Sequence, residues 1–241
     1  MKRAVIITGH FPFQKRRGSI LWVSQHLQEM DWHVTHVTVG YSWLSVIKPD
    51  QRLMTLDYKP KTGVQVYSTT LTTIFGFSPL HPVRTGHAFV DRILARLKSL
   101  FINYWRPRLR KPLREADLVI CESGAPVLLA PLLTQFAPTA ARVYRVNDDI
   151  RLLNAPDHLI NTEHEMLPKF SRVSSANMSL TKRFMHQNTT IDAMGVPNTQ
   201  LKKPRKSPYM DKSSHRVAVC GGTTQLDQRS LRWIAQNRPN W

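Results

Sequence analysis

The sequence predicts an α/β fold, in which a parallel β-sheet is covered by helices on both faces. Short apolar runs rich in β-branched residues alternate with longer segments whose apolar residues recur at helical spacing. The runs are almost continuously apolar, as strands are when helices cover both sides of a parallel sheet. With 241 residues, 41% of them hydrophobic, the chain is also long enough and apolar enough to bury a core.

The first third of the chain predicts a strand, a loop, a helix and two further strands, in that order. Residues 4–8 form the first apolar run, and residues 9–17 form a loop with glycine, histidine, proline and three basic residues. Apolar residues between 20 and 30 recur at helical spacing. Residues 33–39 and 64–69 alternate in polarity and are rich in β-branched side chains, which indicates strands.

Residues 89–104 predict a basic amphipathic helix, with apolar residues on one side and Arg92, Arg96 and Lys98 among the remaining positions. Five basic residues follow this segment: Arg106, Arg108, Arg110, Lys111 and Arg114. Each basic residue near an anionic lipid surface contributes ~1 kcal/mol of attraction, so the segment suits a membrane interface. An ordinary core helix with a solvated face explains the same pattern.

The middle of the chain continues the alternation of strand and helix. We expect strands at 117–121 and 142–146, helices at 126–136 and 156–170, and short extended pieces at 172–175 and 190–193. Because parallel strands need such crossover segments between them, this order supports one parallel sheet.

The composition predicts a domain boundary near residue 197. Residues 1–196 form the first domain, and residues 197–214 hold three prolines with several lysines and serines, which indicates a linker. Residues 215–241 begin a second domain, where Gly221 and Gly222 follow an apolar run and either line a nucleotide site or make a turn. We expect this second domain to be incomplete in the chain.

The net charge of +18 implies an anionic partner such as phospholipid, polyphosphate or nucleic acid. No zinc-finger, RNA-recognition or helix-turn-helix pattern supports nucleic acid, and Trp105 among arginines is the one further hint of base stacking. No stretch reaches the ~20 apolar residues of a membrane-spanning helix, so any membrane contact is expected to be peripheral. Cys121 and Cys220 lie far apart and are expected to be reduced core thiols.

Three loops are candidates for a ligand site, because ligands of open α/β sheets bind beyond the carboxyl ends of the strands. In the first loop, His10 precedes Lys15, Arg16 and Arg17 in front of a helix, which favours phosphate or diphosphate, although a solvated basic loop is the commoner explanation. In the second loop, Glu122, Ser123 and Gly124 follow a strand, and the glycine would permit close approach of a ligand. Alternatively, Ser123 caps the helix that follows.

The third loop carries adjacent carboxylates, Asp148 and Asp149, directly after the expected strand 142–146. A carboxylate at this position suits a general base that takes a proton from an attacking hydroxyl. The alternative is that Asn147, Asp148 or Asp149 forms a turn or caps the next segment. No metal site is predicted, because the histidines of the segment 158–165 lack the i, i+4 spacing of a helical zinc site.

Three stretches give the chain a resemblance to a known family. They are the loop from His10 to Ser19 with its paired arginines, the segment 119–124, and the segment 142–148. In their order and spacing the chain resembles the N-terminal domain of GumK-type glucuronosyltransferases, enzymes of xanthan-type exopolysaccharide synthesis. The resemblance holds from about residue 2 to residue 181 and covers about half of a complete family member.

The resemblance implies a GT-B architecture, in which two Rossmann-like domains face a cleft. The N-terminal domain would hold a polyprenyl-diphosphate-linked oligosaccharide acceptor at the cytoplasmic face of the inner membrane, as a peripheral protein. The enzyme would transfer a glucuronosyl group from UDP-glucuronic acid with inversion, without a metal and without a cofactor beyond this donor. The nucleotide would be held mainly by the C-terminal domain.

The resemblance also implies roles for individual residues. Asp148 matches the family's catalytic base, and Arg16 and Arg17 would hold the acceptor diphosphate. His10, Glu122 and Asp149 would line the acceptor site. The family has Ser-Asp-Gly where this chain has Asn-Asp-Asp at 147–149, so Asp149 is expected to alter the titration of Asp148 as a coupled pair.

The predicted function is therefore that of an inverting glycosyltransferase in exopolysaccharide synthesis, inactive without a complete nucleotide-sugar domain. The alternative is a non-enzymatic basic module that binds a membrane surface or polyphosphate and retains half of the fold. The residues that select the donor sugar are expected to lie in the missing domain. The acceptor sugars, the linkage and the oligomeric state do not follow from the sequence.

Overall fold

The computed structural model describes residues 1–14, 19–42, 45, 51–54, 56, 58–79, 88–153, 155–175, 180, 182–184 and 192–195. The predicted linker at 197–214 and the predicted start of a second domain at 215–241 lie outside the described residues. So do Arg16, Arg17 and Cys220.

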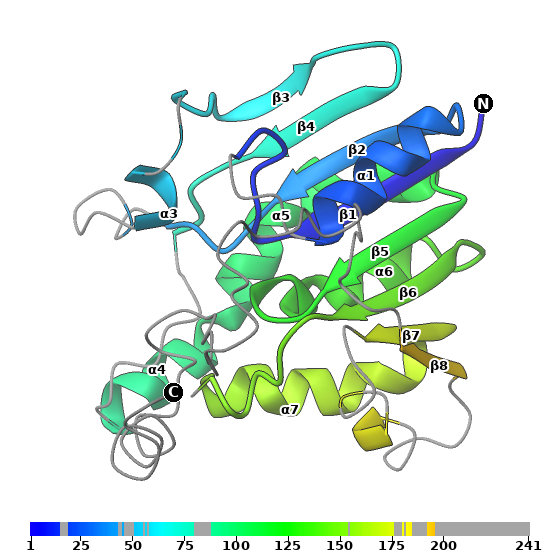
Figure 1. The fold of residues 1–241 in the computed structure, drawn as a ribbon. Helices are drawn as coiled ribbons and strands as arrows, with labels where there is room; N and C mark the ends of the chain where they lie inside the picture. Colours follow the sequence, from blue (N-terminus) through cyan, green and yellow to red (C-terminus); the bar gives the residue numbers. More distant parts are fainter. Residues whose placement is uncertain are drawn as a thin grey trace, which may run out of the picture. The chain divides into compact units, whose positions relative to one another are not determined.

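Within the described residues, one sheet of eight strands forms the centre of the molecule (Figure 1). The strands are β1 (Arg3–Thr8), β2 (His33–Thr38), β3 (Gly63–Val66), β4 (Leu71–Phe75), β5 (Leu118–Glu122), β6 (Ala141–Val146), β7 (Arg172–Ser175) and β8 (Asp192–Gly195). Their order in space is β3-β4-β2-β1-β5-β6-β7-β8. Every neighbouring pair is parallel except β3 and β4, which are antiparallel. The predicted α/β class with a Rossmann-like, mostly parallel sheet is confirmed.

Helices cover both faces of this sheet. The helices of the described residues are α1 (Ser19–Glu29), α3 (Gln51–Met54), α4 (Ala88–Arg96), α5 (Lys98–Arg114), η1 (Ala125–Leu129), α6 (Ala130–Phe136), α7 (Asp157–Met166) and η2 (Leu167–Lys169). Figure 1 shows α1 in front of the sheet and α5 and α6 behind it. Because side chains alternate along a strand, Ile6 of β1 packs against α1 while Val5 and Ile7 pack into the core on the other face.

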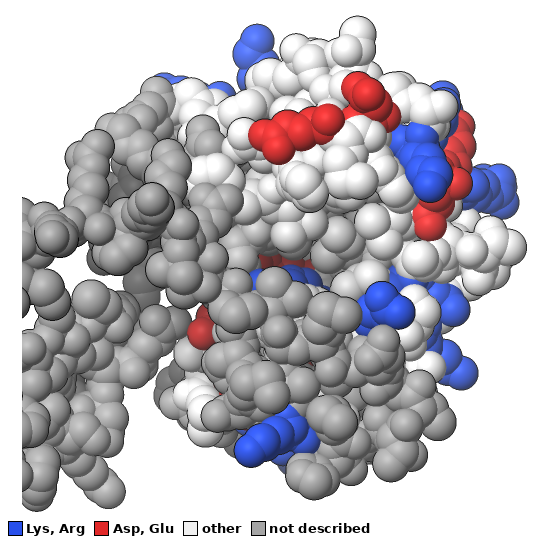
Figure 2. All heavy atoms as spheres, turned by 45° about the vertical axis from the view of Figure 1, so that its right-hand side comes forward, with Lys and Arg blue, Asp and Glu red and all other residues white. Residues whose placement is uncertain are grey.

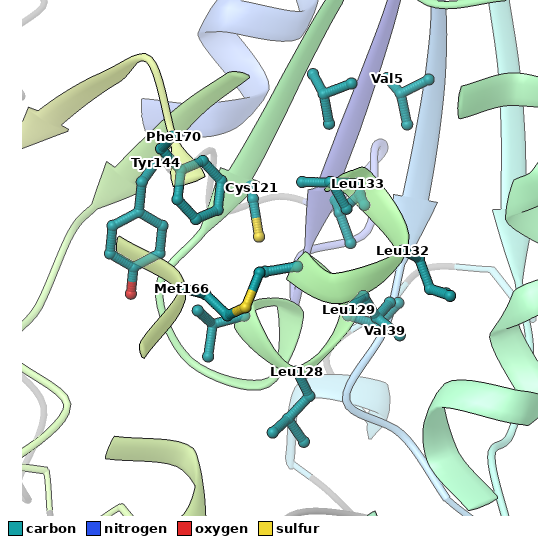
Figure 3. Close-up of a cluster of buried hydrophobic side chains, with 14 of the residues drawn as sticks. Val5, Val39, Cys121, Leu128, Leu129, Leu132, Leu133, Tyr144, Met166 and Phe170 are labelled. Carbon is teal, nitrogen blue, oxygen red and sulfur yellow. The ribbon is translucent and has the colours of Figure 1, made fainter. Parts of the chain in front are cut away.

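The larger core lies between the sheet and the layer of α5, η1, α6 and α7. Figure 3 shows Val5 of β1, Val39 directly after β2 and Cys121 of β5 on the side of the leucines of η1 and α6. Cys121 is a free, buried thiol whose pKa is raised by burial, which agrees with the expected reduced core thiol. Trp105 is fully buried in the same core, so the suggestion that it stacks on nucleic-acid bases is wrong.

The predicted helix at 89–104 is two helices, because α4 ends at Arg96 and α5 begins at Lys98. The second helix extends to Arg114 and contains two prolines, Pro107 and Pro112, which the sequence would place at a helix end. The side chains of α5 that the core buries recur every four residues, and they are Phe101, Trp105, Leu109 and Leu113. This stripe continues past both prolines, so packing against the sheet outweighs the local cost of proline.

The edge of the sheet also differs from the expectation. The segment 64–69 was expected to be one strand, but β3 ends at Val66 and the chain turns back into β4. The backbone amides of Tyr67 and Ser68 both donate to the carbonyl of Leu71, which closes this hairpin. The hairpin explains the single antiparallel pair at the edge, because a short turn joins antiparallel strands only.

No helix of the described residues is long and apolar enough to cross a membrane.

Candidate functional site

The chain changes direction across the sheet between β1 and β5, which lie side by side in its centre. From β1 the chain goes to β2 on one side, and it later returns to β5 on the other side. Loops diverge at such a point and leave a crevice beyond the carboxyl ends of the strands. A hollow of about 240 Å³ lies there, lined by Gly9, His10, Val39 and Gly40 after β2, the segment 122–126, Asn147 and Asp148.

Glu122 ties the strand ends together at the base of this hollow. It is the last residue of β5, and its side chain is only 5% exposed. Its carboxylate accepts hydrogen bonds from the hydroxyl of Thr8 on β1 and from the side-chain amide of Asn147 after β6. Burial raises the pKa of Glu122, although His10, Thr8, the Gly9 amide and Arg145 each partly offset this. The carboxyl group is therefore held by three strand ends.

Arg145 lies beside Glu122, as its register partner on the neighbouring strand β6. The guanidinium is buried and donates to the hydroxyl of Ser174 on β7 at 2.7 Å. A buried carboxyl group next to a buried guanidinium costs less to keep than either group alone.

His10 forms one wall of the hollow. Its side chain is 38% exposed, with Nε2 at 3.7 Å from Glu122 Oε1 and Nδ1 at 3.0 Å from the side-chain nitrogen of Gln14. Its carbonyl oxygen accepts hydrogen bonds from His36 Nε2 at 2.9 Å and from Thr38 Oγ1 at 3.0 Å. The backbone and the imidazole are thus both oriented before any ligand binds.

Asp148 lies at the rim of the hollow and is exposed. Its neighbour Asn147 is anchored, because Nδ2 donates to Glu122 and Oδ1 accepts from the hydroxyl of Ser19 at 3.0 Å. The Asn147 backbone amide also donates to Ser123 Oγ at 3.4 Å. Among the described residues, the carboxylate of Asp148 has no hydrogen-bond or ion-pair partner. It is therefore open to a ligand that enters the hollow.

Asp149 does not line the hollow. Its carboxylate forms ion pairs with Arg183 and with Arg151, the second at 3.5 Å, and accepts a hydrogen bond from the Arg151 amide at 2.9 Å. Burial alone would raise the pKa of Asp149, but the Arg151 amide and the Arg183 guanidinium outweigh it and lower the pKa. Asp148 is not among the charges that shift the pKa of Asp149. Asp149 forms the turn after the strand, as the alternative interpretation of this loop predicted.

The loop after β5 shows why a glycine follows Ser123. The hydroxyl of Ser123 accepts a hydrogen bond from the backbone amide of Asn147. Gly124 occupies the N-cap position of η1, which has no side-chain cap, so the alternative that Ser123 caps this helix is wrong. Gly124 has a φ of 94°, a backbone conformation that residues with a side chain rarely adopt. A Cβ at this position would meet no other atom within 4 Å. Backbone conformation, rather than crowding, requires this glycine.

The structure brings together His10, Glu122 and Asp148 of the predicted site residues. It places Asp149 outside the lining, and Arg16 and Arg17 lie outside the described residues. Sequence reasoning missed Thr8 and Arg183 altogether. A hydroxyl at the end of a strand is a weak signal, and Arg183 lies far from the loop in sequence. In the part of the chain that the structure describes, no three His, Cys, Asp or Glu side chains gather as a metal site.

Comparisons of sequence match most of the chain to one family and to one of its curated relatives. Residues 6–176 match the sequence model of a family described as "Glucuronosyltransferase GumK, N-terminal domain". The chain is also 22% identical over 221 residues to the UDP-glucuronate:glycolipid 2-beta-glucuronosyltransferase of Xanthomonas campestris pv. campestris. That alignment covers 89% of this chain and 53% of the relative, so the chain spans about half the length of the curated relative.

Likeness to solved structures is more remote. The N-terminal domain of Candida albicans trehalose-6-phosphate phosphatase aligns with a TM-score of 0.48 and 13% identity, over 82% of this chain and 48% of that one. Phytolacca americana UGT2, complexed with UDP-2fluoro-glucose and pterostilbene, aligns with a TM-score of 0.47 and 8% identity, over 82% and 54% of the two chains.

Proposed function

The chain belongs to the family of GumK glucuronosyltransferase N-terminal domains, and from this premise we propose that it is the acceptor-binding half of an inverting glycosyltransferase. The complete enzyme would transfer a glucuronosyl group from UDP-glucuronic acid to a lipid-linked oligosaccharide in exopolysaccharide synthesis. The observation that carries the proposal is the exposed carboxylate of Asp148 in a hollow shared with His10 and Glu122.

Asp148 is the proposed general base. The acceptor hydroxyl attacks the anomeric carbon of the donor while the bond from that carbon to the UDP oxygen breaks. UDP leaves with the electron pair, and the proton of the hydroxyl passes to the Asp148 carboxylate and later to water. A base for this step must be reachable by a large substrate, and the exposure of Asp148 at the rim meets that requirement.

His10 and Glu122 are proposed to orient the acceptor sugar. The imidazole of His10 is partly exposed towards the hollow and held by Glu122 and Gln14, so a sugar hydroxyl would meet a group that is already in place. Arg16 and Arg17 are proposed to hold the diphosphate of the acceptor, as the resemblance implies. Arginine suits phosphate because its planar guanidinium donates two parallel hydrogen bonds.

We further propose that α4 and α5 face the anionic surface of the inner membrane, on the cytoplasmic side. Three large apolar side chains are exposed here, with exposed fractions of 74% for Phe89, 41% for Ile93 and 45% for Leu100. The sequence of α5 contains six Lys or Arg and no Asp or Glu. By contrast, on the face drawn in Figure 2 the Lys and Arg side chains lie scattered, with Asp and Glu side chains near several of them.

The combination of exposed apolar residues and neighbouring cations favours an interfacial role for this surface. One side of α5 still belongs to the core, because Phe101, Trp105, Leu109 and Leu113 are buried. Attraction to anionic lipid at ~1 kcal/mol per basic residue would suffice for peripheral, salt-sensitive binding.

We propose that the donor nucleotide sugar is bound by the C-terminal domain of the complete enzyme. The matched relative is about twice as long as the aligned chain, since the alignment covers 53% of it. We expect this chain alone to bind acceptor and membrane without transferring sugar, because the donor would not be brought to the hydroxyl. No metal ion or cofactor beyond the nucleotide sugar is proposed.

Asp148→Asn tests the proposed base. In a chimera that joins this chain to the C-terminal half of the Xanthomonas campestris relative, transfer of labelled glucuronate to membrane lipid should fall by about 100-fold or more. Binding to liposomes should not change, because Asp148 belongs to neither of the two helices proposed to face the membrane. Asp157→Asn, which changes an exposed aspartate at the start of α7, is the matched control.

Two results would contradict the proposal. Full turnover by Asp148→Asn would remove Asp148 as the base. If the unmodified chimera binds liposomes but incorporates no sugar from any UDP-sugar donor, the result would favour the alternative function, a non-enzymatic module that binds membranes.

A further inference from the structure

A buried ionic cluster lies behind the loop that carries Asp148. Its members are Tyr144 of β6, Glu163 of α7, Arg183 of the segment 182–184, and Asp149. The exposed fractions of the side chains are 5% for Glu163, 15% for Arg183 and 12% for Asp149. The cluster therefore joins three separate parts of the fold to the turn that follows Asp148.

Arg183 is the centre of this cluster. One guanidinium nitrogen forms an ion pair with Asp149 Oδ2, and the other lies 3.4 Å from Glu163 Oε2. Glu163 is in turn held by the hydroxyl of Tyr144, which donates to Oε1. A guanidinium can bridge two carboxylates in a fixed geometry, whereas the ammonium group of lysine acts as a single point charge.

Aromatic packing holds Arg183 in place. Its guanidinium carbon lies 4.8 Å from the centre of the Phe184 ring. Phe184 is fully buried and meets the Tyr144 ring edge to face, at a centroid distance of 6.2 Å. Figure 3 shows Tyr144 within the core, beside Phe170. The guanidinium is thus fixed by the same core that supports β6.

The charges of this cluster are not explained by stability alone. Removing ions from water has a cost that their mutual attraction often fails to recover, so apolar residues of similar volume serve a core as well or better. Burial raises the pKa of Glu163 even though Tyr144 and Arg183 act to lower it. A buried ionic group that costs free energy is better explained by the geometry that it imposes.

We propose that Arg183 is a positioning residue for Asp148, acting through the ion pair with Asp149. This inference rests on the proposed function, in which Asp148 is the base. On the other side of Asp148, Asn147 is anchored to Glu122 and Ser19. Asp148 is therefore held between two fixed neighbours, and its carboxylate is presented to the hollow while that of Asp149 is withdrawn from it.

The first test measures the loop directly and does not need activity. The amides of Arg151, Leu152 and Leu153 all donate to Asp149, so their hydrogen exchange reports the turn. Arg183→Gln should accelerate their exchange at least about tenfold, the effect of losing a hydrogen bond to a charged group. Arg151→Gln is the matched control for Leu152 and Leu153, because its guanidinium also contacts Asp149 but is 44% exposed, and it should change little.

The second test measures sugar transfer in the chimera described above. Arg183→Gln should lower kcat about 100-fold, the typical effect of misplacing a catalytic group by about 1 Å, and should leave the KM for the lipid acceptor within about twofold. Arg183→Lys should recover part of kcat. Combined with Asp148→Asn, Arg183→Gln should cause no further loss, because both changes act on the same carboxylate.

The possible outcomes separate this inference from the proposed function. Unchanged amide exchange in Arg183→Gln, or faster exchange with an unchanged kcat, would overturn the positioning role. If Asp148→Asn retains activity, the proposed base fails, while the exchange measurement still decides whether Arg183 fixes the turn. If Arg183→Gln does not fold, Asp149→Asn removes the same ion pair from the loop, and the same two measurements apply to it.

Discussion

His36 shows how one buried residue fixes the first loop of the site. The side chain is fully buried, and Nε2 donates to the carbonyl of His10 at 2.9 Å. Burial lowers the pKa of His36 from 6.5 to about 4, because the protonated ring would lose its hydration. The folded state therefore requires a neutral imidazole at this position.

This burial predicts a loss of stability in mild acid. The stability that neutral His36 provides is complete above its unfolded pKa of 6.5 and is lost as the pH falls towards the folded pKa of about 4. Between about pH 7 and about pH 5, the free energy of unfolding should fall by about 2 kcal/mol from this residue. Urea unfolding of His36→Gln should show a drop smaller by this amount, because glutamine does not titrate.

The control for this experiment is His26→Gln, which changes a histidine whose side chain is 71% exposed. Its pH dependence should match that of the unmodified chain. An unchanged pH dependence in His36→Gln would mean that other buried groups cause the acid sensitivity.

At the scale of residues, the sequence predicts which side chains meet when each one directly follows a strand. His10, Glu122 and Asp148 come after β1, at the end of β5 and after β6, and parallel topology brings these positions to one edge. It does not predict which of two adjacent carboxylates enters the hollow. That choice depends on Arg183, which reaches Asp149 from a segment more than thirty residues later.

At the scale of elements, α5 approaches the end of β4 so closely that the contact requires a glycine. A Cβ on Gly76 would overlap the hydroxyl oxygen of Tyr104 and would lie 3.3 Å from the ring carbon that bears it. The Tyr104 ring is also fixed on its other side, with the Arg108 guanidinium 3.9 Å from its centre. The hydroxyl therefore has little freedom to move away.

This contact predicts a mutation and its rescue. Gly76→Ala should lower the free energy of unfolding by about 1 to 3 kcal/mol, the usual cost of overpacking. Adding Tyr104→Phe removes the nearest atom and should restore most of the loss, whereas Tyr104→Phe alone should change stability little. A double-mutant cycle by thermal unfolding measures this coupling, and strictly additive effects would contradict the contact.

Elements were predictable where local pattern and tertiary packing agree. The strands β1 and β5 contain apolar runs that the sheet buries, so period and environment give the same answer. The continuation of α5 past Pro107 was not predictable, because local preference ends a helix there and only contact with the core extends it. The strand β4 was not predicted either, because it carries two threonines in five residues and lacks a strong apolar pattern.

At the scale of the whole molecule, the net charge of +18 and the candidate site serve different purposes. The hollow itself combines an imidazole with carboxyl groups, so it is not a simple cationic site. The surplus of cations is concentrated in part along α5, which has no acidic residue in its sequence. A long-range field of this kind attracts an anionic surface, while the hollow binds and orients a substrate.

The proposed membrane surface can be separated from charge attraction by removing its apolar residues alone. Phe89→Ser with Ile93→Ser keeps every cation, so any loss of binding comes from apolar contact with lipid. Each side chain that enters the membrane interface contributes up to about 1.5 to 3 kcal/mol, so the affinity for anionic vesicles should fall at least about tenfold. Sedimentation with vesicles of phosphatidylglycerol and phosphatidylethanolamine measures this affinity across a salt series.

The matched control changes two exposed apolar residues of β3, at an edge of the sheet, Val64→Ser with Val66→Ser, whose exposed fractions are 57% and 76%. This variant should bind vesicles as the unmodified chain does. For the unmodified chain, binding should weaken as salt rises, because the Debye length shortens from about 10 Å at 0.1 M to about 3 Å at 1 M. No loss in either variant would mean that α4 does not contact lipid and that charge alone holds the protein at the surface. Equal losses in both variants would mean that apolar contact with lipid is not specific to α4.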